Sequence, residues 1–376
     1  MAIKHFTFDG SLTDLFVRFG YEIYQGDSKW IPPFEKEVYA QLSPEFPFYQ
    51  KPGNYHRHFL ATSGKKLVGR ISAMVNKELR DKDGTPVATV GFFESINDYS
   101  VARDLLDSAL GWLCEEQRIS RIWGPMNFDI WHDHRFMNRG FDQKLFYGEP
   151  YNKPYYPGFF ERYGFSSKQE WDSVEITGCE TLRKMIARGA ERYKLLIKRG
   201  YRLELFDVRN FKEELRKLHA VISKSFGGFL GYTPIPFEQF EKLFAKSRYA
   251  FNPRFCVLAY DEKDNLAGFA TAFIELSDAI RAMNGKNNLV SKFKFLRNRR
   301  KADRINFYIG GVIPEEVQKR SGLGRAGFYY TINQILNAGF ETLLLTLRVK
   351  GNLAHGLLGK NAPEPQREYI LYELNR

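Results

Sequence analysis

A turn rich in glycine and basic residues lies between two apolar segments near the end of the chain. The segment before it, Ile305–Ile313, is predicted to be a strand, and the segment after it, Gly324–Ala338, a helix. The first amides of a helix have no acceptor within the helix, and the helix dipole favours an anion there. The turn is therefore predicted to bind a phosphate through the backbone amides of residues 320–325, unless it is a helix-capping loop with solvated basic side chains. The residues of the turn are Lys319, Arg320, Ser321, Gly322, Leu323, Gly324 and Arg325.

Several side chains are candidates for accepting a proton in a reaction at this turn. A histidine in a polar loop titrates near neutral pH, and the run Trp131–Arg135 contains two. Two histidines separated by one residue, with no third ligand in view, predict no metal site. The alternative for this run is a hydrogen-bonded structural loop under an aromatic cover. The candidate bases are Glu315, Glu94, His132, His134 and Asp133.

The composition provides enough apolar residues for two domains. The chain has 376 residues, of which 43% are hydrophobic and 16% aromatic, so disorder is not expected. No apolar run approaches the roughly 20 residues that span a membrane, and the N-terminal segment lacks the apolar core of a signal peptide. The three cysteines of the chain are scattered without the spacing of disulfides or metal ligands. We therefore expect a soluble, cytoplasmic protein.

The formal net charge of +12 favours an anionic partner. A nucleotide phosphate, an acidic membrane surface and a nucleic acid would all satisfy this charge. The sequence has no zinc-finger, RNP-type or heptad pattern, which argues against nucleic acid as the main partner.

The order of predicted elements is repeated in the two halves of the chain. Residues 59–75 and 255–273 both read as a strand, a polar turn and a second strand, at an offset of 196 residues. A further strand, a helix and another strand follow in each half, and the second half carries an insertion at residues 277–304. The sequence therefore predicts a tandem duplication of one α/β (α+β) unit, with domains at 1–178 and 179–376. Chance similarity between two α/β segments is the alternative.

This order of elements, with a basic turn between a strand and a helix, resembles the GNAT superfamily of acyl-CoA-dependent N-acyltransferases. The superfamily turn reads Gln/Arg-x-x-Gly-x-Gly/Ala, and here Lys319 stands first, followed by Gly322 and Gly324. The chain has about two more residues than usual between Pro314 and Gly322. Runs such as Gly124–Phe128 also resemble a bacterial GNAT-like family whose members mostly lack an assigned substrate. The resemblance implies two tandem GNAT-like domains, each a mixed, mostly antiparallel sheet flanked by helices.

The same resemblance implies acetyl-CoA or another acyl-CoA as co-substrate, and no metal. Strands Ile305–Ile313 and Thr342–Leu347 would part to admit the thioester, and an amide near Gly311 or Val312 would polarise its carbonyl. The pair of glycines is equally consistent with a bulge that binds no ligand. Many members use a helix tyrosine as general acid, whereas this chain has Phe160 at that place in its first half and Gly359 in its second.

The two halves differ at the position of the phosphate turn. The first half has Glu94-Ser95-Ile96-Asn97-Asp98 there, and its two carboxylates would repel a pyrophosphate. We therefore expect one CoA site, in the C-terminal half, with the N-terminal half as scaffold or acceptor pocket.

The insertion at residues 277–304 combines nine basic residues with interleaved apolar ones. Three interpretations stay open: a surface helix that contacts anionic lipid or a lipid-linked substrate, a clamp for the 3′-phosphate of CoA, or a solvated loop.

The expected function is acyl-CoA-dependent transfer of an acetyl or longer acyl group to the amine of a small molecule or peptide. One alternative is a Fem-like transferase that uses aminoacyl-tRNA, and another is a non-catalytic protein that binds acyl-CoA or lipid. The sequence leaves open the acceptor, the acyl length and the oligomeric state.

Overall fold

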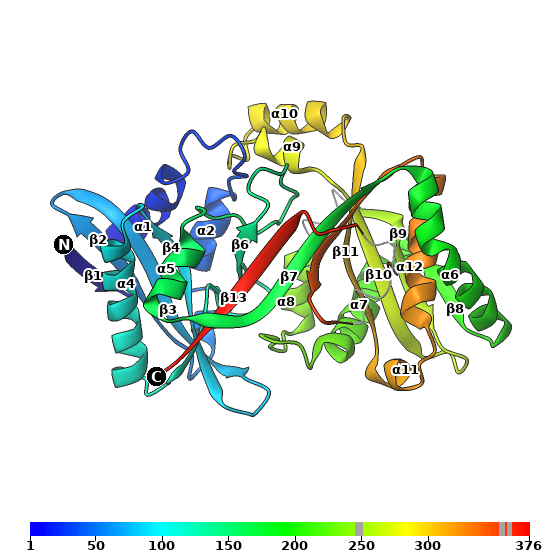
Figure 1. Cartoon of the computed structure of the whole chain (residues 1–376), viewed down its shortest axis with the longest axis horizontal. Coiled ribbons are helices and arrows are strands. Elements are labelled where there is room, and N and C mark those ends of the chain that lie inside the picture. The colour runs from blue at the N-terminus through cyan, green and yellow to red at the C-terminus, as the bar shows by residue number, and fades with distance from the viewer. Residues whose placement is uncertain (245–250, 353–357, 359–362) are drawn as a thin grey trace.

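Thirteen strands form one continuous sheet through the part of the chain that the structure describes (Figure 1). The computed structural model describes residues 1–244, 251–352, 358 and 363–376. The strand order is β1-β2-β3-β4-β5-β13-β7-β12-β11-β10-β9-β8, and β6 pairs with β13. The strands are β1 (Ala2–Phe6), β2 (Tyr55–Ser63), β3 (Lys66–Arg80), β4 (Pro86–Ser95), β5 (Arg121–Gly124), β6 (Phe136–Arg139), β7 (Ser166–Thr177), β8 (Arg202–Leu205), β9 (Phe251–Tyr260), β10 (Leu266–Ile274), β11 (Arg304–Val312), β12 (Thr342–Val349) and β13 (Arg367–Asn375).

The sheet is mixed and mostly antiparallel, as predicted. The pairs β4–β5 and β11–β12 are parallel, and the other strand pairs of the described sheet are antiparallel. Each half thus contributes five strands in the same order, β1 to β5 and β8 to β12, with its parallel pair at the end nearest the middle of the molecule.

The last strand of each half lies beside the fifth strand of the other half. Strand β13 ends the chain and pairs with β5, where Tyr372 lies opposite Gly124. Strand β7 precedes residue 178 and pairs with β12, where Val174 lies opposite Leu345. The two exchanged strands also pair with each other. The division at residue 178 stays a prediction, and hydrogen bonds of the sheet cross it in both directions.

Helices cover both faces of this sheet (Figure 1). None of the helices in the described ranges combines the length and apolarity that crossing a bilayer requires. The helices are α1 (Gly10–Glu22), α2 (Glu35–Gln41), α3 (Pro47–Gln50), α4 (Tyr99–Gly111), α5 (Tyr156–Tyr163), α6 (Cys179–Lys198), α7 (Phe211–Phe226), α8 (Phe237–Phe244), α9 (Ser277–Arg281), α10 (Leu289–Arg299), α11 (Pro314–Gln318) and α12 (Leu323–Asn337).

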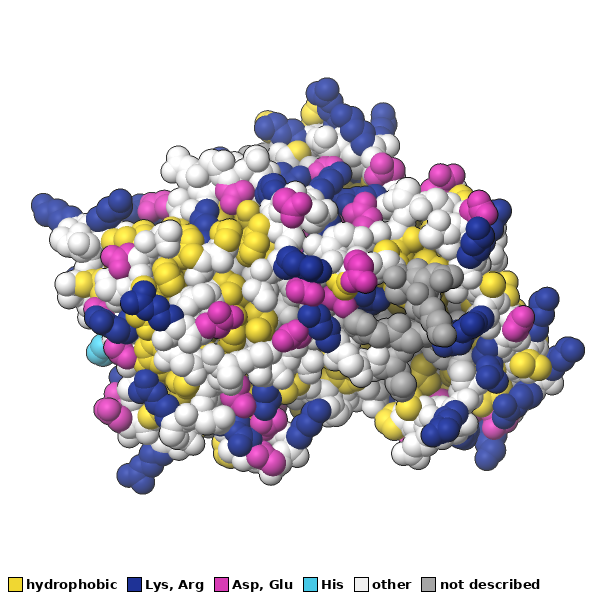
Figure 2. All heavy atoms as spheres, in the orientation of Figure 1, with side chains coloured by type: hydrophobic (Ala, Val, Ile, Leu, Met, Phe, Trp, Pro, Cys, Tyr) yellow, Lys and Arg dark blue, Asp and Glu magenta, His cyan; other side chains and the backbone are white. Residues whose placement is uncertain are grey.

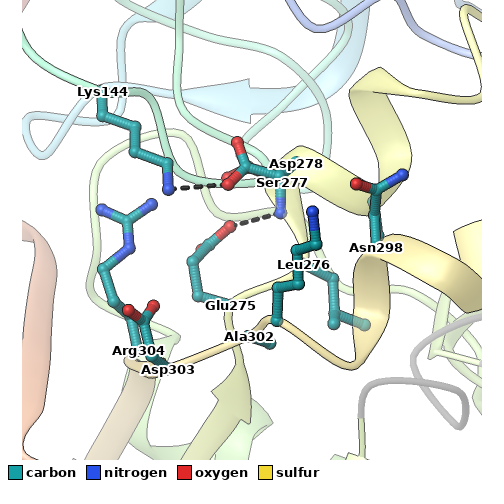
Figure 3. Close-up of a pocket in the computed structure, with 11 residues that line it drawn as sticks. Lys144, Glu275, Leu276, Ser277, Asp278, Asn298, Ala302, Asp303 and Arg304 are labelled. Atoms are coloured by element: carbon teal, nitrogen blue, oxygen red, sulfur yellow. Dashed lines mark hydrogen bonds and ion pairs between the residues drawn. The ribbon is translucent and has the colours of Figure 1, made fainter.

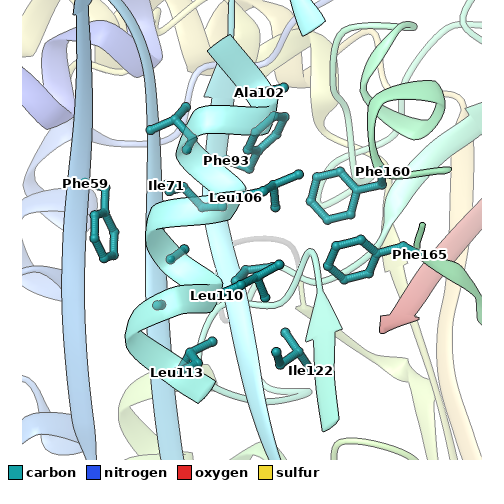
Figure 4. Packing of buried hydrophobic residues seen from close by; sticks show 14 of the residues in the cluster. Phe59, Ile71, Phe93, Ala102, Leu106, Leu110, Leu113, Ile122, Phe160 and Phe165 are labelled. Atoms are coloured by element: carbon teal, nitrogen blue, oxygen red, sulfur yellow. The ribbon is translucent and has the colours of Figure 1, made fainter. Parts of the chain in front are cut away.

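The core of the N-terminal half lies between helix α4 and the sheet. Asp98 caps α4 by accepting a hydrogen bond from the Ser100 amide at 2.9 Å. The apolar residues of α4 recur at helical spacing, so that Leu106 and Leu110 face the aromatic ring of Phe160 on α5 (Figure 4). Phe160 is therefore a core residue in this structure.

In the C-terminal half, helix α6 packs closely along helix α12. A Cβ on Gly189 of α6 would lie 2.6 Å from the Cβ of Tyr329 and 2.9 Å from the carbonyl oxygen of Arg325. Glycine at this position lets the two helices approach. The approach brings the second half of α6 to the start of α12, where the predicted phosphate turn lies.

Candidate active site

The parallel strands β11 and β12 separate part-way along their length. They pair over residues 304–307 of β11 and 342–345 of β12, and beyond that point the pairing of β11 in the described chain is with β10. Tyr308 is the extra residue of a bulge there, since its neighbours on either side pair with the consecutive residues Ala272 and Thr271. This separation is the one that the resemblance leads us to expect, and Tyr308 stands at its start.

Gly311 and Val312 lie on the separated part of β11. A Cβ on Gly311 would lie 2.8 Å from the ring of Phe269 and 3.0 Å from the Cβ of Ser225, so packing alone requires glycine here. That an amide near Gly311 or Val312 polarises a carbonyl stays a prediction.

The predicted phosphate turn follows helix α11, a short helix that accounts for the extra residues before Gly322. Gly322 has a φ of 79° and is the N-cap of α12, and this left-handed backbone favours glycine. The amides of Arg320 and Ser321 donate to carbonyls of α11, and the Leu323 amide donates to the Ser321 hydroxyl at 3.2 Å. The amide of Gly324 lies in the first helical turn, where α12 has no acceptor for it. Gly324 is thus better placed to donate to a phosphate than the three amides with internal acceptors.

Lys319 is engaged with carboxylates beside the turn. Its Nζ lies 2.7 Å from buried Glu316 and 3.8 Å from Glu262, and Glu316 also accepts from the Tyr201 hydroxyl at 3.0 Å. Among the described residues, Asp261, Glu262 and Glu316 form the group of carboxylates close enough together to hold a metal ion. The ammonium of Lys319 already supplies a positive charge to this group.

Arg192 of helix α6 lies directly over Gly322. A Cβ on Gly322 would lie 2.7 Å from the Nε of Arg192, so the side chain passes across the N-terminus of α12. Arg192 is exposed, and Arg320 and Arg325 lie in the same region. No sequence signal links Arg192 to this turn, because it belongs to another helix, 130 positions before Gly322.

The matching gap between β4 and β5 in the N-terminal half is filled by protein. Phe92 has a φ of 47° in a bulge of β4, and its amide donates to the Asn127 Oδ1 at 2.8 Å. A Cβ on Gly91 would lie 2.2 Å from the same oxygen. The segment that follows β5 therefore packs onto the β4 bulge, and helix α4 is capped by its own Asp98. Both observations favour the C-terminal half for a phosphate-bearing ligand.

Glu94 belongs to a buried polar network in the N-terminal half. Its carboxylate accepts from the Tyr156 hydroxyl at 2.7 Å and lies 3.7 Å from the Arg70 guanidinium. Burial raises the pKa of Glu94 to about 7, although the charge of Arg70 opposes this shift. The phenol next to β4 thus comes from Tyr156, one helical turn before Phe160. The resemblance points to Phe160 instead, so Tyr156 has no signal of its own in the sequence.

Replacing Glu94 by glutamine is expected to change how stability depends on pH. The folded-state pKa of Glu94 is raised, so its contribution is complete below the unfolded-state pKa and is lost as pH rises to about 7. The advantage of the wild type over Glu94→Gln should therefore fall by up to ~3 kcal/mol between pH 5 and pH 8. Urea unfolding of both proteins at the two pH values measures this difference. An advantage that grows with pH would mean that the ionised Glu94–Arg70 pair stabilises the fold instead.

The two histidines are held by contacts of their own loop. His132 Nδ1 contacts Asp129 at 2.7 Å, and the same carboxylate accepts from Thr233 of the C-terminal half at 2.8 Å. His134 Nδ1 faces the His132 carbonyl at 2.8 Å, and burial together with the Arg135 charge holds the pKa of His134 well below its usual range. These contacts match the structural alternative for the loop, and a catalytic role of either histidine stays a prediction. Glu315 is exposed in the first turn of α11.

Asp133 has a different environment from the histidines on either side of it. Its side chain is exposed, yet desolvation raises its pKa. Tyr147 and Tyr308 share this combination of exposure and desolvation. Their side chains are 48% and 45% exposed. Desolvation raises the pKa of Tyr147 to about 12 and that of Tyr308 above its usual value. Each of these side chains is thus reached by water on one side and desolvated by surrounding protein on the other. The charge of Asp133 acts on both tyrosines, so the three side chains lie near one another, and Tyr308 stands at the bulge where β11 leaves β12.

An apolar cavity of about 30 Å³ is lined by residues of α7, α8 and strands β9 to β11. Its lining includes the rings of Phe240, Phe251 and Phe273 and the side chain of Ile309, which follows Tyr308 in β11. The rings of Phe273 and Tyr308 are in contact, with centroids 5.5 Å apart. Tyr308 is thus in contact with the apolar packing around this cavity.

Comparisons with known proteins give distant relatives, and no protein-family model matches the chain. Protein YghO of Escherichia coli (strain K12) is 24% identical over 278 residues, which are 72% of this chain and 67% of that protein. The bacterial ceramide synthase of Caulobacter vibrioides is 23% identical over 266 residues, which are 69% of this chain and 66% of that protein. The matches span about two thirds of the length of these relatives. Among solved structures, a tandem GNAT protein from the clavulanic acid biosynthesis pathway has a TM-score of 0.50 at 12% identity and covers 100% of this chain and 98% of its own.

Proposed function

We propose that this chain, which has the tandem GNAT fold that its sequence predicts, transfers an acyl group from acyl-CoA to an amine. The observation that carries the proposal is the separation of strands β11 and β12 at Tyr308, followed along the chain by the Gly322 turn at the start of α12. The amine nitrogen attacks the thioester carbonyl carbon, a C–N bond forms and the C–S bond breaks. The amine loses a proton, and the leaving thiolate gains one.

Residues of the two halves divide the work in this proposal. The turn at Gly322 binds the pyrophosphate, with charge from Arg192, Arg320 and Arg325. Asp133 takes the proton of the amine, because its raised pKa makes it a stronger base than an ordinary aspartate. Tyr308 keeps its proton at neutral pH, since its pKa is also raised, and its hydroxyl donates to the leaving thiolate.

We further propose a fatty-acyl group and a long-chain amine as the substrates. A ceramide is a fatty acid joined by an amide bond to a long-chain amino alcohol, and the name of one relative specifies its synthesis. The apolar cavity beside Ile309 supports an apolar substrate. Its volume of about 30 Å³ equals about two probe-sized groups, so a long chain enters only if lining rings such as that of Phe240 turn aside.

Calorimetry followed by a turnover assay tests this function. The protein is titrated with CoA, acetyl-CoA and palmitoyl-CoA, and release of free thiol is then followed with a C18 amino alcohol and with short amines. We expect palmitoyl-CoA to bind more tightly than acetyl-CoA, and the long-chain amine to be acylated. No binding of any CoA compound would overturn the proposal and favour the Fem-like alternative. Binding without turnover across the amine panel would favour the non-catalytic alternative.

Replacing Arg192 by serine is expected to weaken CoA binding roughly 10- to 100-fold, because a charge-assisted hydrogen bond to phosphate is lost. Arg192 is exposed, so the fold should be unaffected. Lys184→Ser on the same helix is the matched control, since it removes one charge about 12 Å farther along the axis. Equal affinities for CoA in the two variants would contradict the placement of the phosphate at Gly322.

A further inference from the structure

Helix α10 presents its apolar side chains to solvent. Leu289, Phe293 and Leu296 are 84%, 70% and 57% exposed, and Val290 is also exposed. Positions separated by three and four residues share one face of a helix, so the first three side chains form a single stripe. A helix that packs on its own protein has the reverse arrangement, with the apolar stripe turned inward.

The opposite face of α10 carries the polar side chains and is turned toward the protein. Ser291 is buried, and Asn298 lines a small polar pocket beneath the helix, together with Glu275 and Asp278 (Figure 3). Contacts within the chain therefore do not account for the apolar stripe.

The stripe stands in a strongly basic segment. Residues 279–302 contain no aspartate or glutamate. Lys292 and Arg299 lie along one side of the stripe and Lys294 and Arg297 on the other, by helical spacing. Figure 2 shows dark-blue basic side chains with yellow apolar ones between them at the top of the molecule, where Figure 1 shows α10. The basic residues of the segment are Arg281, Lys286, Lys292, Lys294, Arg297, Arg299, Arg300 and Lys301.

Helix α10 is held in a defined orientation on the body. Its N-terminus has a capping box, in which the Asn288 side chain accepts from the Ser291 amide and the Ser291 hydroxyl accepts from the Asn288 amide, both at 2.9 Å. The preceding helix α9 is tied to the N-terminal half by an ion pair of 2.7 Å between Asp278 and Lys144 (Figure 3). The stripe is thus formed before any partner binds.

We propose that α10 docks the protein on the surface of a bilayer that contains anionic phospholipid. The apolar stripe would enter the boundary between headgroups and acyl chains, while the flanking lysine and arginine side chains reach the phosphates. A nucleic acid would satisfy the charges and leave the apolar stripe exposed to water. A second copy of the chain would bring two equally basic segments together. The bilayer surface complements both features.

Vesicle flotation of the full chain tests this docking. The protein is mixed with vesicles of phosphatidylcholine alone, or of phosphatidylcholine and phosphatidylglycerol at 7:3. We expect more than tenfold stronger binding to the anionic vesicles, because each basic residue near the surface contributes about fivefold. The triple variant Leu289→Ser, Phe293→Ser, Leu296→Ser should lose more than tenfold in binding. The double variant Leu195→Ser, Ile197→Ser, which removes exposed apolar side chains from α6, is the matched control and should bind like the wild type.

Charge variants and two further measurements distinguish a bilayer from the two other possible partners, a nucleic acid and a second copy of the chain. Replacing Lys292, Lys294 and Arg297 by glutamate should abolish binding to anionic vesicles. Equal binding to both vesicle types, or an unchanged triple serine variant, would overturn the proposal. So would a dimer in light scattering that the triple serine variant loses, or duplex binding that depends on the basic residues and not on the stripe. These measurements require no turnover, so their outcome is independent of the acyl-transfer proposal.

Discussion

Replacing Asp133 by asparagine is expected to lower kcat about 10²- to 10⁴-fold, the contribution of a positioned general base. Asparagine has nearly the same shape and cannot take the proton of the attacking amine. Asp133 lies near Tyr308 and is not part of the Gly322 turn, so the affinity for acyl-CoA should stay within about twofold, as for an interaction made only during the reaction. Single-turnover rates and calorimetry measure the two quantities separately. Asp142→Asn, an exposed aspartate of the next loop, is the matched control.

The pH dependence of the rate provides a second readout for Asp133. A general base acts in its ionised form, so the rate rises with pH as the carboxyl loses its proton. Desolvation raises the pKa of Asp133, which places this rise above the range of an ordinary aspartate. The rise should be present in the wild type and in Asp142→Asn and absent in Asp133→Asn. An Asp133→Asn enzyme within threefold of the wild type would rule out this base and make Glu315 the next candidate.

Local features of the candidate site could be predicted from the sequence, and contacts between distant segments could not. The turn at Gly322 is encoded by consecutive residues, because glycine spacing and the start of an apolar helical face are read over a short window. The position of Arg192 depends on how closely α6 approaches α12, which Gly189 permits. Tyr308 became a candidate only with the register of the β11 bulge, since a single extra residue in a strand leaves no clear sequence signal. Asp133 was one of several candidate bases until its exposure distinguished it from His132 and His134.

The same division applies to the fold. The strands and helices of both halves, and the repeat of their order, follow from periodicity within each segment. The exchange of β7 and β13 does not, because the alternation of side chains along a strand does not specify which fifth strand it pairs with. Strand partners are chosen by packing across the whole molecule. The duplication predicted from the sequence therefore gives the strands and helices of each half. It does not give the exchange, by which each half supplies a strand to the sheet of the other.

Separating the chain at residue 178 is expected to leave neither fragment able to fold. Residues 1–178 alone lack β13, whose Tyr369, Leu371 and Tyr372 are fully or almost fully buried. Burial of each such side chain contributes about 1.5–3 kcal/mol, and the net stability of a domain is only about 5–15 kcal/mol. The N-terminal fragment would also expose the edge of β5 that pairs with β13 in the full chain. The fragment 179–376 loses β7 in the same way and leaves β12 unpaired on one edge.

Expression of the fragments separately and together tests this dependence. We expect each fragment alone to be insoluble or to unfold without a cooperative transition, and the co-expressed pair to form a stable complex. Residues 1–178 joined by a flexible linker to residues 363–376 regain β13 and serve as the control that should restore solubility. A buried ion pair anchors β13, in which Arg367 lies 3.3 Å from Glu149. The rescue should also require this pair, because an unpaired buried charge costs about 3–5 kcal/mol. A cooperatively unfolding 1–178 fragment would show instead that the N-terminal half is complete without the last strand, and that the exchange joins two independent domains.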